Sequence, residues 1–452
     1  MQSVSNIISY PDLLIALIYF LAIILVANFV KSRNINKYPE YKYLTKALIA
    51  KLIGATIFCL VYVFYYNGGD TTNYFLGSKA LVGVLFQDIE KGIALIFNTD
   101  SYFNSWKSFN AGSGYPPTYM WRDTQTFAVS RFSSLFYILG SGSFIVTSFF
   151  TAVFSFIGIW KLYRLFNMLY PGYSKGLFYI MLVLPTLIFW GSGIMKDSYV
   201  LGSTCWLTFN FYRIFIERKH LLWNIIFLQL NLLILLNTKA YVLISLFPGI
   251  ILWINSAYLK TSKSFVSKTL KLPLFILIFG FGGYIVLSNI SSLMGVYGDV
   301  DSALEQAQVI QQDLLREEAY GSNNYNIGKI DGSIGGVFSL APVAVFTAIY
   351  RPLFWEIGSP IMVISVIENT ILLFFSLYLF INVGPLRLAR VLFSEPILLY
   401  AFVFSIIFAF GVGIASTNFG ALVRYRVPLI PFYFPMLFLV FKISNKKKLS
   451  KV

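Results

Sequence analysis

Histidine and cysteine, on which many catalytic and metal sites depend, are almost missing from this sequence. Among 452 residues there is one histidine, His220, which lies beside an arginine and a lysine in a short polar break. A single histidine in such a loop argues against Ser-His-Asp catalysis and against a histidine-based zinc site. The two cysteines, Cys59 and Cys205, both lie within apolar runs. This position indicates buried free thiols, and neither a disulfide framework nor a cysteine metal site.

Charged residues are scarce as well. They make up 12% of the chain, whereas hydrophobic residues make up 57%. A soluble domain has about 25% charged and about 45–50% apolar residues, so a water-soluble fold could not hide this much apolar surface. The sequence also lacks a GxxxxGKS or GxxxxGKT phosphate loop and a GxGxxG motif after a strand. ATP-driven transport and dinucleotide chemistry therefore have no support.

Long apolar runs are present along the whole chain. About 20 apolar residues cross the hydrocarbon core as a helix, and about eleven such runs recur. They lie near 11–30, 45–66, 141–160, 177–193, 198–216, 222–237, 240–258, 272–289, 358–381, 395–414 and 427–442. The first run lacks a small-residue cleavage site, so we expect a retained helix and no signal peptide. We therefore predict an all-α, polytopic transmembrane helical bundle that forms a single membrane domain over residues 1–452.

Lysine and arginine are concentrated in alternate breaks between these runs. Because cytoplasmic loops carry the excess of these residues, the pattern predicts an outside N-terminus, an inside C-terminus and a basic cytoplasmic tail at 443–452. The basic residues on the predicted inner side include Lys31, Arg33, Lys37, Lys42, Lys46, Lys161, Arg164, Lys175, Arg213, Arg218, Lys219, Lys260, Lys263, Lys268, Lys271, Arg387, Arg390, Lys446, Lys447, Lys448 and Lys451. Topology thus accounts for the net charge of +16, and no nucleic-acid partner is expected.

Two long stretches without a span, 67–140 and 290–357, fall on the opposite, extracytoplasmic side with most of the acidic residues. In the first stretch an apolar residue recurs every four positions over 75–97, which predicts an interfacial helix. These positions are Leu81, Leu85, Ile89 and Ile93. In the second stretch Ser302 and Glu305 have the spacing of a capping box, which predicts that a helix starts there.

Carboxylates and cations are the remaining candidates for chemistry on the outer side. Asp70 follows two glycines at the outer end of the second run, where the backbone can turn sharply. A carboxylate there can accept the proton of an acceptor hydroxyl within hydrogen-bond reach; the alternative is a solvated turn at the C-terminus of a helix. Lys196 and Asp197 lie in a short outer hairpin. They belong to a site or serve as interfacial anchors.

Two arginines, Arg424 and Arg426, lie at the outer mouth of the last run, against the positive-inside trend. The planar donors of arginine suit phosphate oxygens at headgroup depth, whereas snorkelling to the interface is the alternative. Arg122 and Arg351 are outer charges that line a sugar or phosphate site or are structural. Glu368 lies near the middle of a run, where it relays protons or forms a hydrogen bond while protonated.

Two short motifs carry a resemblance to a known family. They are Gly69-Asp70 with Tyr74 on the first outer loop, and Arg424-Tyr425-x-x-Pro428-x-x-Pro431 near the last run. The combination resembles the C-type glycosyltransferase superfamily, polytopic enzymes that transfer sugars from polyprenyl-phosphate carriers on the extracytoplasmic face. Bacterial surface-polysaccharide polymerases are similar in architecture. The resemblance implies that Asp70 is the base, that Arg424 and by proximity Arg426 bind the lipid phosphate, and that the chain is multi-pass in a bacterial plasma (inner) membrane.

From this resemblance we expect a glycosyltransferase or polysaccharide polymerase that takes sugar from a polyprenyl-linked sugar or oligosaccharide during cell-surface glycan synthesis. The further residues expected to contact substrate are Tyr74, Arg122, Lys196, Asp197 and Arg351. Some relatives hold a divalent metal at the phosphate, and the lone Asp70 leaves this open. A transporter or flippase of lipid-linked oligosaccharide and a non-catalytic assembly subunit are the alternatives. The polar residues gathered at the outer surface favour the enzyme, because transporters place such residues near the midplane.

Overall fold

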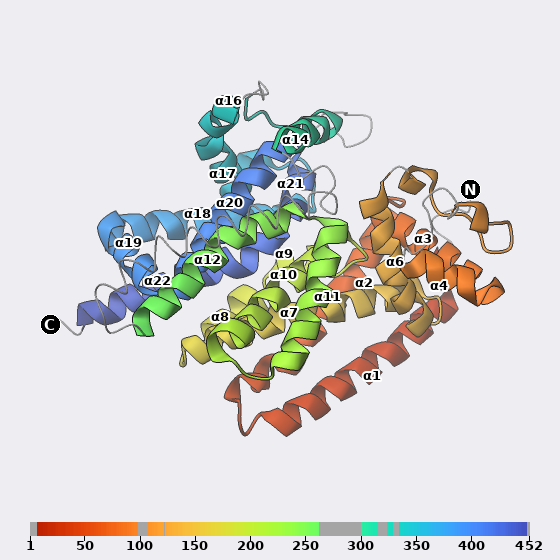
Figure 1. Cartoon of the computed structure of the whole chain (residues 1–452), viewed down its shortest axis with the longest axis horizontal. Helices are drawn as coiled ribbons and strands as arrows, with labels where there is room; N and C mark the ends of the chain where they lie inside the picture. Colours follow the sequence, from red (N-terminus) through yellow and green to blue (C-terminus); the bar gives the residue numbers. More distant parts are fainter. Residues whose placement is uncertain are drawn as a thin grey trace. The chain divides into compact units, whose positions relative to one another are not determined.

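The computed structural model describes residues 7–97, 106–121, 123–261, 300–314, 323–328 and 334–449 (Figure 1). Within these ranges all regular secondary structure is helical, and an isolated bridge pairs Asn324 with Asn418. The predicted all-α class is therefore confirmed for this part of the chain. The chain divides into two compact units. Unit 1 comprises Met1–Asn210 and Ile226–Lys239, and unit 2 comprises Phe211–Ile225 and Ala240–Val452.

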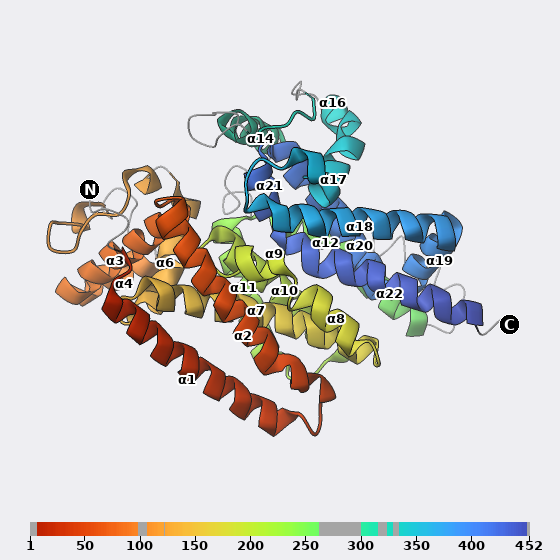
Figure 2. The same ribbon diagram turned by 180° about the vertical axis from the view of Figure 1, so that it is seen from behind.

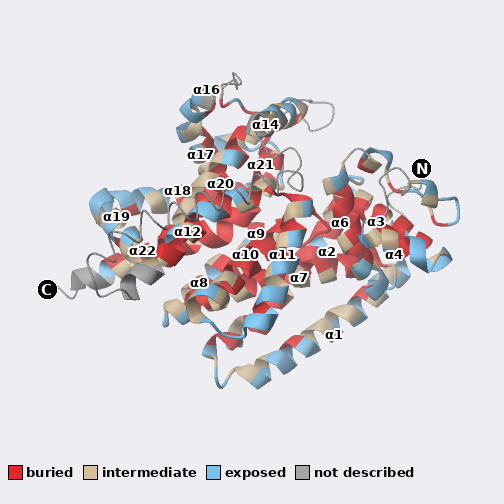
Figure 3. Ribbon diagram, in the orientation of Figure 1, coloured by how far each residue is buried: buried red, intermediate tan, exposed pale blue. Residues whose placement is uncertain are grey.

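Unit 1 is built around the long helices α2 and α7. Its helices are α1 (Tyr10–Asn34), α2 (Leu44–Leu60), α3 (Asp70–Gln87), α4 (Ile89–Phe97), α6 (Thr124–Leu139), α7 (Phe144–Leu169), α8 (Ser174–Met181), α9 (Pro185–Trp190), α10 (Lys196–Phe211) and most of α11 (Leu221–Thr238). Helix α2 packs against α1, α7 and α9, and α3 packs against α4 and α6. Every residue from Asp197 to Asn210 of α10 is buried (Figure 3). Helix α10 is therefore a core element of unit 1.

Two glycines allow α10 to approach α7 closely. A Cβ atom added at Gly158 of α7 would lie 2.0 Å from the carbonyl oxygen of Gly202 in α10. No side chain fits at such a distance, so the backbones themselves are in contact. This contact fixes the position of α10, whose first residue is Lys196.

Unit 2 is built around α20. Its helices are α12 (Tyr241–Thr261), α14 (Val300–Leu314), α16 (Ile334–Ser339), α17 (Ala341–Tyr350), α18 (Met362–Val383), α19 (Pro385–Ser394), α20 (Pro396–Ala415), α21 (Phe419–Tyr425) and α22 (Ile430–Leu449) (Figure 2). Helix α20 packs against α12, α14, α17, α19 and α22. Helix α18 packs against α22 and α19. The aromatic pair Phe404 and Phe432, with ring centroids 4.8 Å apart, joins α20 to α22.

Within the described ranges, seven helical segments are long and apolar enough to span a membrane. They are Tyr10–Asn34, Pro39–Tyr65, Phe144–Leu169, Leu221–Thr238, Met362–Val383, Pro396–Ala415 and Phe419–Asn445. The chain is thus a multi-pass membrane protein. The number of eleven is not confirmed, and the predicted orientation stays a prediction. The predicted run at 272–289 lies outside the described residues.

One predicted run, 177–193, is not a continuous helix. It forms the short helices α8 and α9, which are separated at Leu182–Leu184, and α9 ends before Gly191. The physical reason lies in Pro185, which cannot continue a preceding helix because it lacks an amide donor, and in the Gly191-Ser192-Gly193 break. The broken segment leads directly into Lys196.

The two long stretches predicted to lie outside, 67–140 and 290–357, contain several helices each within the described ranges. Segment 75–97 is divided between α3 and α4 by Asp88, which is extended. The apolar residues of the predicted interfacial helix differ in exposure. Leu81 is fully buried in the protein, whereas Ile89 and Ile93 are exposed and available to lipid. In the second stretch the predicted helix is present as α14, but it is already helical at Val300. The capping-box start at Ser302 is therefore wrong.

Candidate functional site

Asp70 is the first residue of α3 and lies at the positive end of that helix. The preceding Gly68 and Gly69 have φ angles of 119° and 130°, which side chains of L-residues rarely adopt. The glycines thus allow the chain to turn from α2 into α3 and place a carboxylate where the helix dipole favours negative charge. The alternative of a C-terminal helix turn is wrong, because Asp70 begins a helix.

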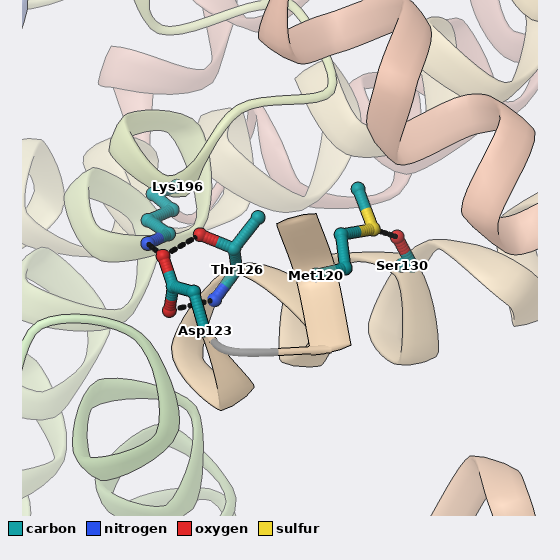
Figure 4. A network of polar contacts seen from close by, with 5 residues as sticks. All are labelled: Met120, Asp123, Thr126, Ser130 and Lys196. Carbon is teal, nitrogen blue, oxygen red and sulfur yellow. Dashed lines mark hydrogen bonds and ion pairs between the residues drawn. The ribbon is translucent and has the colours of Figure 1, made fainter. Parts of the chain in front are cut away.

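Asp123 and Lys196 form an ion pair that the sequence analysis did not predict, because the two residues lie 73 positions apart. Asp123 is the N-cap of α6, and its Oδ1 accepts the Thr126 amide at 2.9 Å (Figure 4). Its Oδ2 accepts the Thr126 hydroxyl and lies 3.3 Å from the Lys196 Nζ. Burial alone raises the pKa of Asp123, but Lys196 and the Thr126 donors outweigh burial and hold this pKa below its usual range. Asp123 is therefore ionised at neutral pH.

Lys196 is affected by several charges in unit 1. Burial lowers its pKa, the negative charges of Asp123 and Asp70 oppose this shift, and the positive charge of Lys239 adds to it. The net effect is a pKa below that of an ordinary lysine. Lys196 is thus a cation that is paired with Asp123 and influenced by Asp70, and a bound anion would raise its pKa.

Tyr119 completes this group. It lies in the 3-10 turn Thr118–Trp121, its hydroxyl is hydrogen-bonded to the Asn73 side chain, and its side chain is partly exposed. Burial and the charges of Asp70 and Asp123 raise the pKa of Tyr119, so its phenol stays protonated. No local sequence pattern marks this residue beyond its place in the stretch 67–140. We call Asp70, Tyr119, Asp123 and Lys196 the unit 1 polar cluster.

Met120, the neighbour of Tyr119, is held in place by Ser130 of α6. The Ser130 hydroxyl lies 3.7 Å from the Met120 sulfur (Figure 4). It also donates to the Tyr74 carbonyl of α3 at 3.1 Å. Tyr74 itself is buried, so the structure places the phenol predicted to contact substrate inside the packing of α3. Arg122, also predicted to contact substrate, lies outside the described residues.

Asp197, predicted to bind substrate, forms a buried ion pair instead. Its Oδ1 accepts from the Lys239 Nζ at 2.6 Å, and both side chains are less than 10% exposed. Lys239 lies between α11 and α12, so a lone lysine between two apolar runs was the available sequence signal. The pair anchors the first turn of α10 and thereby the neighbouring Lys196.

Arg426 of unit 2 is also occupied within the fold. Its Nη1 donates to the carbonyls of Ala348, Ile349 and Arg351 at 3.3, 3.2 and 3.0 Å, and its Nη2 donates to the Asn369 side chain. The guanidinium therefore satisfies carbonyls at the C-terminal end of α17, which have no partner within the helix. Because these donors are used and the side chain is buried, we assign Arg426 a structural role in place of the predicted phosphate contact.

The other charged residues of unit 2 differ in their surroundings. Arg351 donates through Nε to Glu356 at 2.9 Å, and its guanidinium lies 5.0 Å from the ring centroids of Tyr325 and of Phe419. Arg424 lies in the last turn of α21 and is only partly buried. Glu368 is buried on α18.

Metal ligands are few in the described ranges. No group of three or more histidine, cysteine, aspartate or glutamate side chains is close enough to hold a metal ion in the part of the chain that the structure describes. Comparisons of the chain with protein-family models, with curated proteins and with solved structures find no match. The chemistry of the unit 1 polar cluster is therefore the basis for a function.

Proposed function

We propose that the protein is a membrane glycosyltransferase or polysaccharide polymerase that takes sugar from a polyprenyl-linked donor on the extracytoplasmic face. The observation that supports the proposal is the unit 1 polar cluster, in which Asp123 forms an ion pair with Lys196 and the charge of Asp70 acts on Lys196 and Tyr119. A carboxylate, a cation and a protonated phenol are the groups that this reaction needs. The expected partners are polyprenyl-linked sugar or oligosaccharide and membrane lipid.

The proposed reaction needs no nucleotide, because polyprenyl phosphate or diphosphate is itself a good leaving group. The acceptor hydroxyl gives its proton to the Asp70 carboxylate while its oxygen forms the new bond to the anomeric carbon of the sugar. The bond from that carbon to the carrier phosphate breaks, and the phosphate leaves with the electron pair. Lys196 stabilises the negative charge that grows on the phosphate, and Tyr119 donates a hydrogen bond to a substrate oxygen.

The pKa of Lys196 is expected to change when substrate binds. A phosphate that approaches its Nζ adds a negative charge to those of Asp123 and Asp70 and raises the pKa that burial has lowered. The lysine cation is then stabilised further when the site is occupied. Arg424 is a proposed further phosphate contact in unit 2, and this role stays a prediction.

The test compares Asp70→Asn with Asp88→Asn in cells that lack the native protein. Asp88 is the matched control, since it belongs to the same outer stretch but forms an exposed ion pair with Lys91 at 2.8 Å. Loss of a general base reduces the rate by about 100- to 10,000-fold. We therefore expect polyprenyl-linked glycan to accumulate on the outer leaflet with Asp70→Asn and not with Asp88→Asn.

Other outcomes of this experiment contradict the proposal. Carrier that is trapped on the inner leaflet indicates a flippase, because the lipid is then never delivered to the outer side. Full complementation by Asp70→Asn removes Asp70 from the reaction. A Lys196→Met variant distinguishes the phosphate contact of Lys196 from the base role of Asp70. It is expected to weaken donor binding as well as turnover, because the proposed phosphate contact is lost.

A flippase or transporter of lipid-linked oligosaccharide is the second candidate, and one observation favours it. The segment α8–α9 is broken next to Lys51, a buried lysine of α2 whose Nζ donates to the Leu187 carbonyl of α9 at 2.7 Å. Ionisable residues inside spans and interrupted helices are typical of transport pathways. The hydrogen bond from Lys51 to the Leu187 carbonyl is equally consistent with a structural role, in which the lysine holds α9 against α2.

A further inference from the structure

Helix α18 presents a long apolar face that no described residue of unit 2 covers. Its exposed residues recur at three- and four-residue intervals, as one face of a helix requires. They are Ile364, Ile367, Ile371, Phe374, Tyr378 and Ile381. The face is about 26 Å long at 1.5 Å per residue, close to the thickness of about 30 Å of a hydrocarbon core. This face is therefore suited to lipid tails.

At the end of that face the chain turns into a basic amphipathic helix. Gly384, with a φ of 82°, ends α18, and Pro385 begins α19. Helix α19 adjoins the end of α18 (Figures 1 and 2). Leu386 and Phe393 of α19 are 83% and 73% exposed, so exposed apolar side chains continue from α18 onto α19. Exposed apolar residues of this size at the end of a span are stabilised by insertion into the headgroup boundary.

Two arginines lie on the same short helix. Arg390 is exposed and Arg387 is partly exposed, and neither forms an ion pair within the described ranges. Helix α22, which packs against α19, carries the further cation Lys442 near its C-terminal end. Guanidinium groups bind phosphate oxygens through paired donors, and apolar neighbours at the same depth favour a phosphate that carries acyl chains.

We propose that Arg387 and Arg390, together with Leu386 and Phe393, form a binding surface for the headgroup of an anionic phospholipid. The phosphodiester lies against the two guanidinium groups, while an acyl chain continues along the exposed face of α18. The predicted topology places this loop in the cytoplasmic leaflet, where anionic lipids attract basic segments. The role is independent of the proposed sugar transfer, since none of these residues belongs to the unit 1 polar cluster.

The test is native mass spectrometry of the full chain in detergent with phosphatidylglycerol or phosphatidylcholine added. Each basic residue near an anionic lipid surface accounts for about a fivefold change in affinity, so Arg387→Gln/Arg390→Gln is expected to weaken phosphatidylglycerol binding about thirtyfold. Binding of phosphatidylcholine is expected to change little. Lys46→Gln/Lys175→Gln is the control, because it removes two exposed cations from unit 1.

Three results would overturn the proposal. In the first, phosphatidylglycerol binding is weakened equally in the control variant, which indicates an effect of general surface charge. In the second, the wild type does not prefer phosphatidylglycerol to phosphatidylcholine. In the third, the preference is kept in the Arg387→Gln/Arg390→Gln variant. If the glutamine variant does not fold, Arg387→Lys/Arg390→Lys keeps both charges and must retain the preference within a few-fold. High salt must then reduce this preference, and a preference that salt does not change contradicts the proposal.

Discussion

Replacement of Arg426 by lysine should destabilise unit 2 strongly although the charge is kept. The guanidinium donates to three carbonyls at the end of α17 and to Asn369 of α18, and it is buried. A lysine ammonium has three donors at a single point and cannot reach two helices in this planar arrangement. At least one or two buried acceptors thus lose their partner, each at a cost of about 1–3 kcal/mol. We expect a loss of about 2–5 kcal/mol in the free energy of unfolding.

The assay is thermal unfolding of the purified chain in one detergent, without added anionic lipid. For a unit of this size 1 kcal/mol shifts the midpoint by about 2–4 °C, so Arg426→Lys is expected to lower it by about 4–20 °C. Arg390→Lys is the matched control in the same unit, because Arg390 is exposed on α19. A midpoint for Arg426→Lys within 2 °C of the control, about the shift that 1 kcal/mol produces, would refute the structural role of Arg426.

Three further predictions concern unit 1. Lys239→Met should lower the free energy of unfolding by about 3–5 kcal/mol in thermal melts, because it leaves the buried Asp197 without its counter-ion; an unchanged melt contradicts a buried pair. Lys196→Arg should extend activity to higher pH, because the lowered pKa of the lysine makes it lose its proton as pH rises, whereas arginine stays charged; a pH–rate profile with the same alkaline limb excludes Lys196 as the titrating group. Gly193→Ala should cost about 1–3 kcal/mol, since its Cβ would lie 1.9 Å from the Phe58 ring, and an alanine variant that melts like the wild type contradicts this contact.

Hydrophobic run length predicted the membrane-spanning helices where a single apolar stretch forms a single helix. Tyr10–Asn34 and Pro396–Ala415 are of this kind, and both agree closely with predicted runs. Run length could not predict the break at 177–193, because Leu, Ile and Phe around Pro185 keep the segment apolar even though proline interrupts the helical hydrogen bonds. The apolarity of a run measures its affinity for lipid, whereas the continuity of a helix depends on unbroken backbone hydrogen bonds.

The candidate site was only partly predictable for a similar reason. Asp70 was evident because two glycines precede it, and Lys196 because it interrupts apolar sequence. Asp123 and Tyr119 become important only through contacts across α3, α6 and α10, and no local pattern encodes such contacts. Arg426 shows the opposite case, since its sequence position suggested phosphate whereas its donors are used by backbone carbonyls.

Lys196 pairs with a residue that precedes it in the chain, whereas the adjacent Asp197 pairs with one that follows it. The two ion pairs therefore become possible at different times during synthesis. Asp123 is made before Lys196, whereas Lys239 follows Asp197 by 42 residues. At about 5–20 residues per second, the ribosome makes Lys239 about 2–8 seconds after Asp197. During that interval the Asp197 carboxylate lacks its Lys239 partner, and burial of a carboxylate before its partner is present is unfavourable. The buried pair at the first turn of α10 is therefore complete only after the chain has been made through α11 to Lys239.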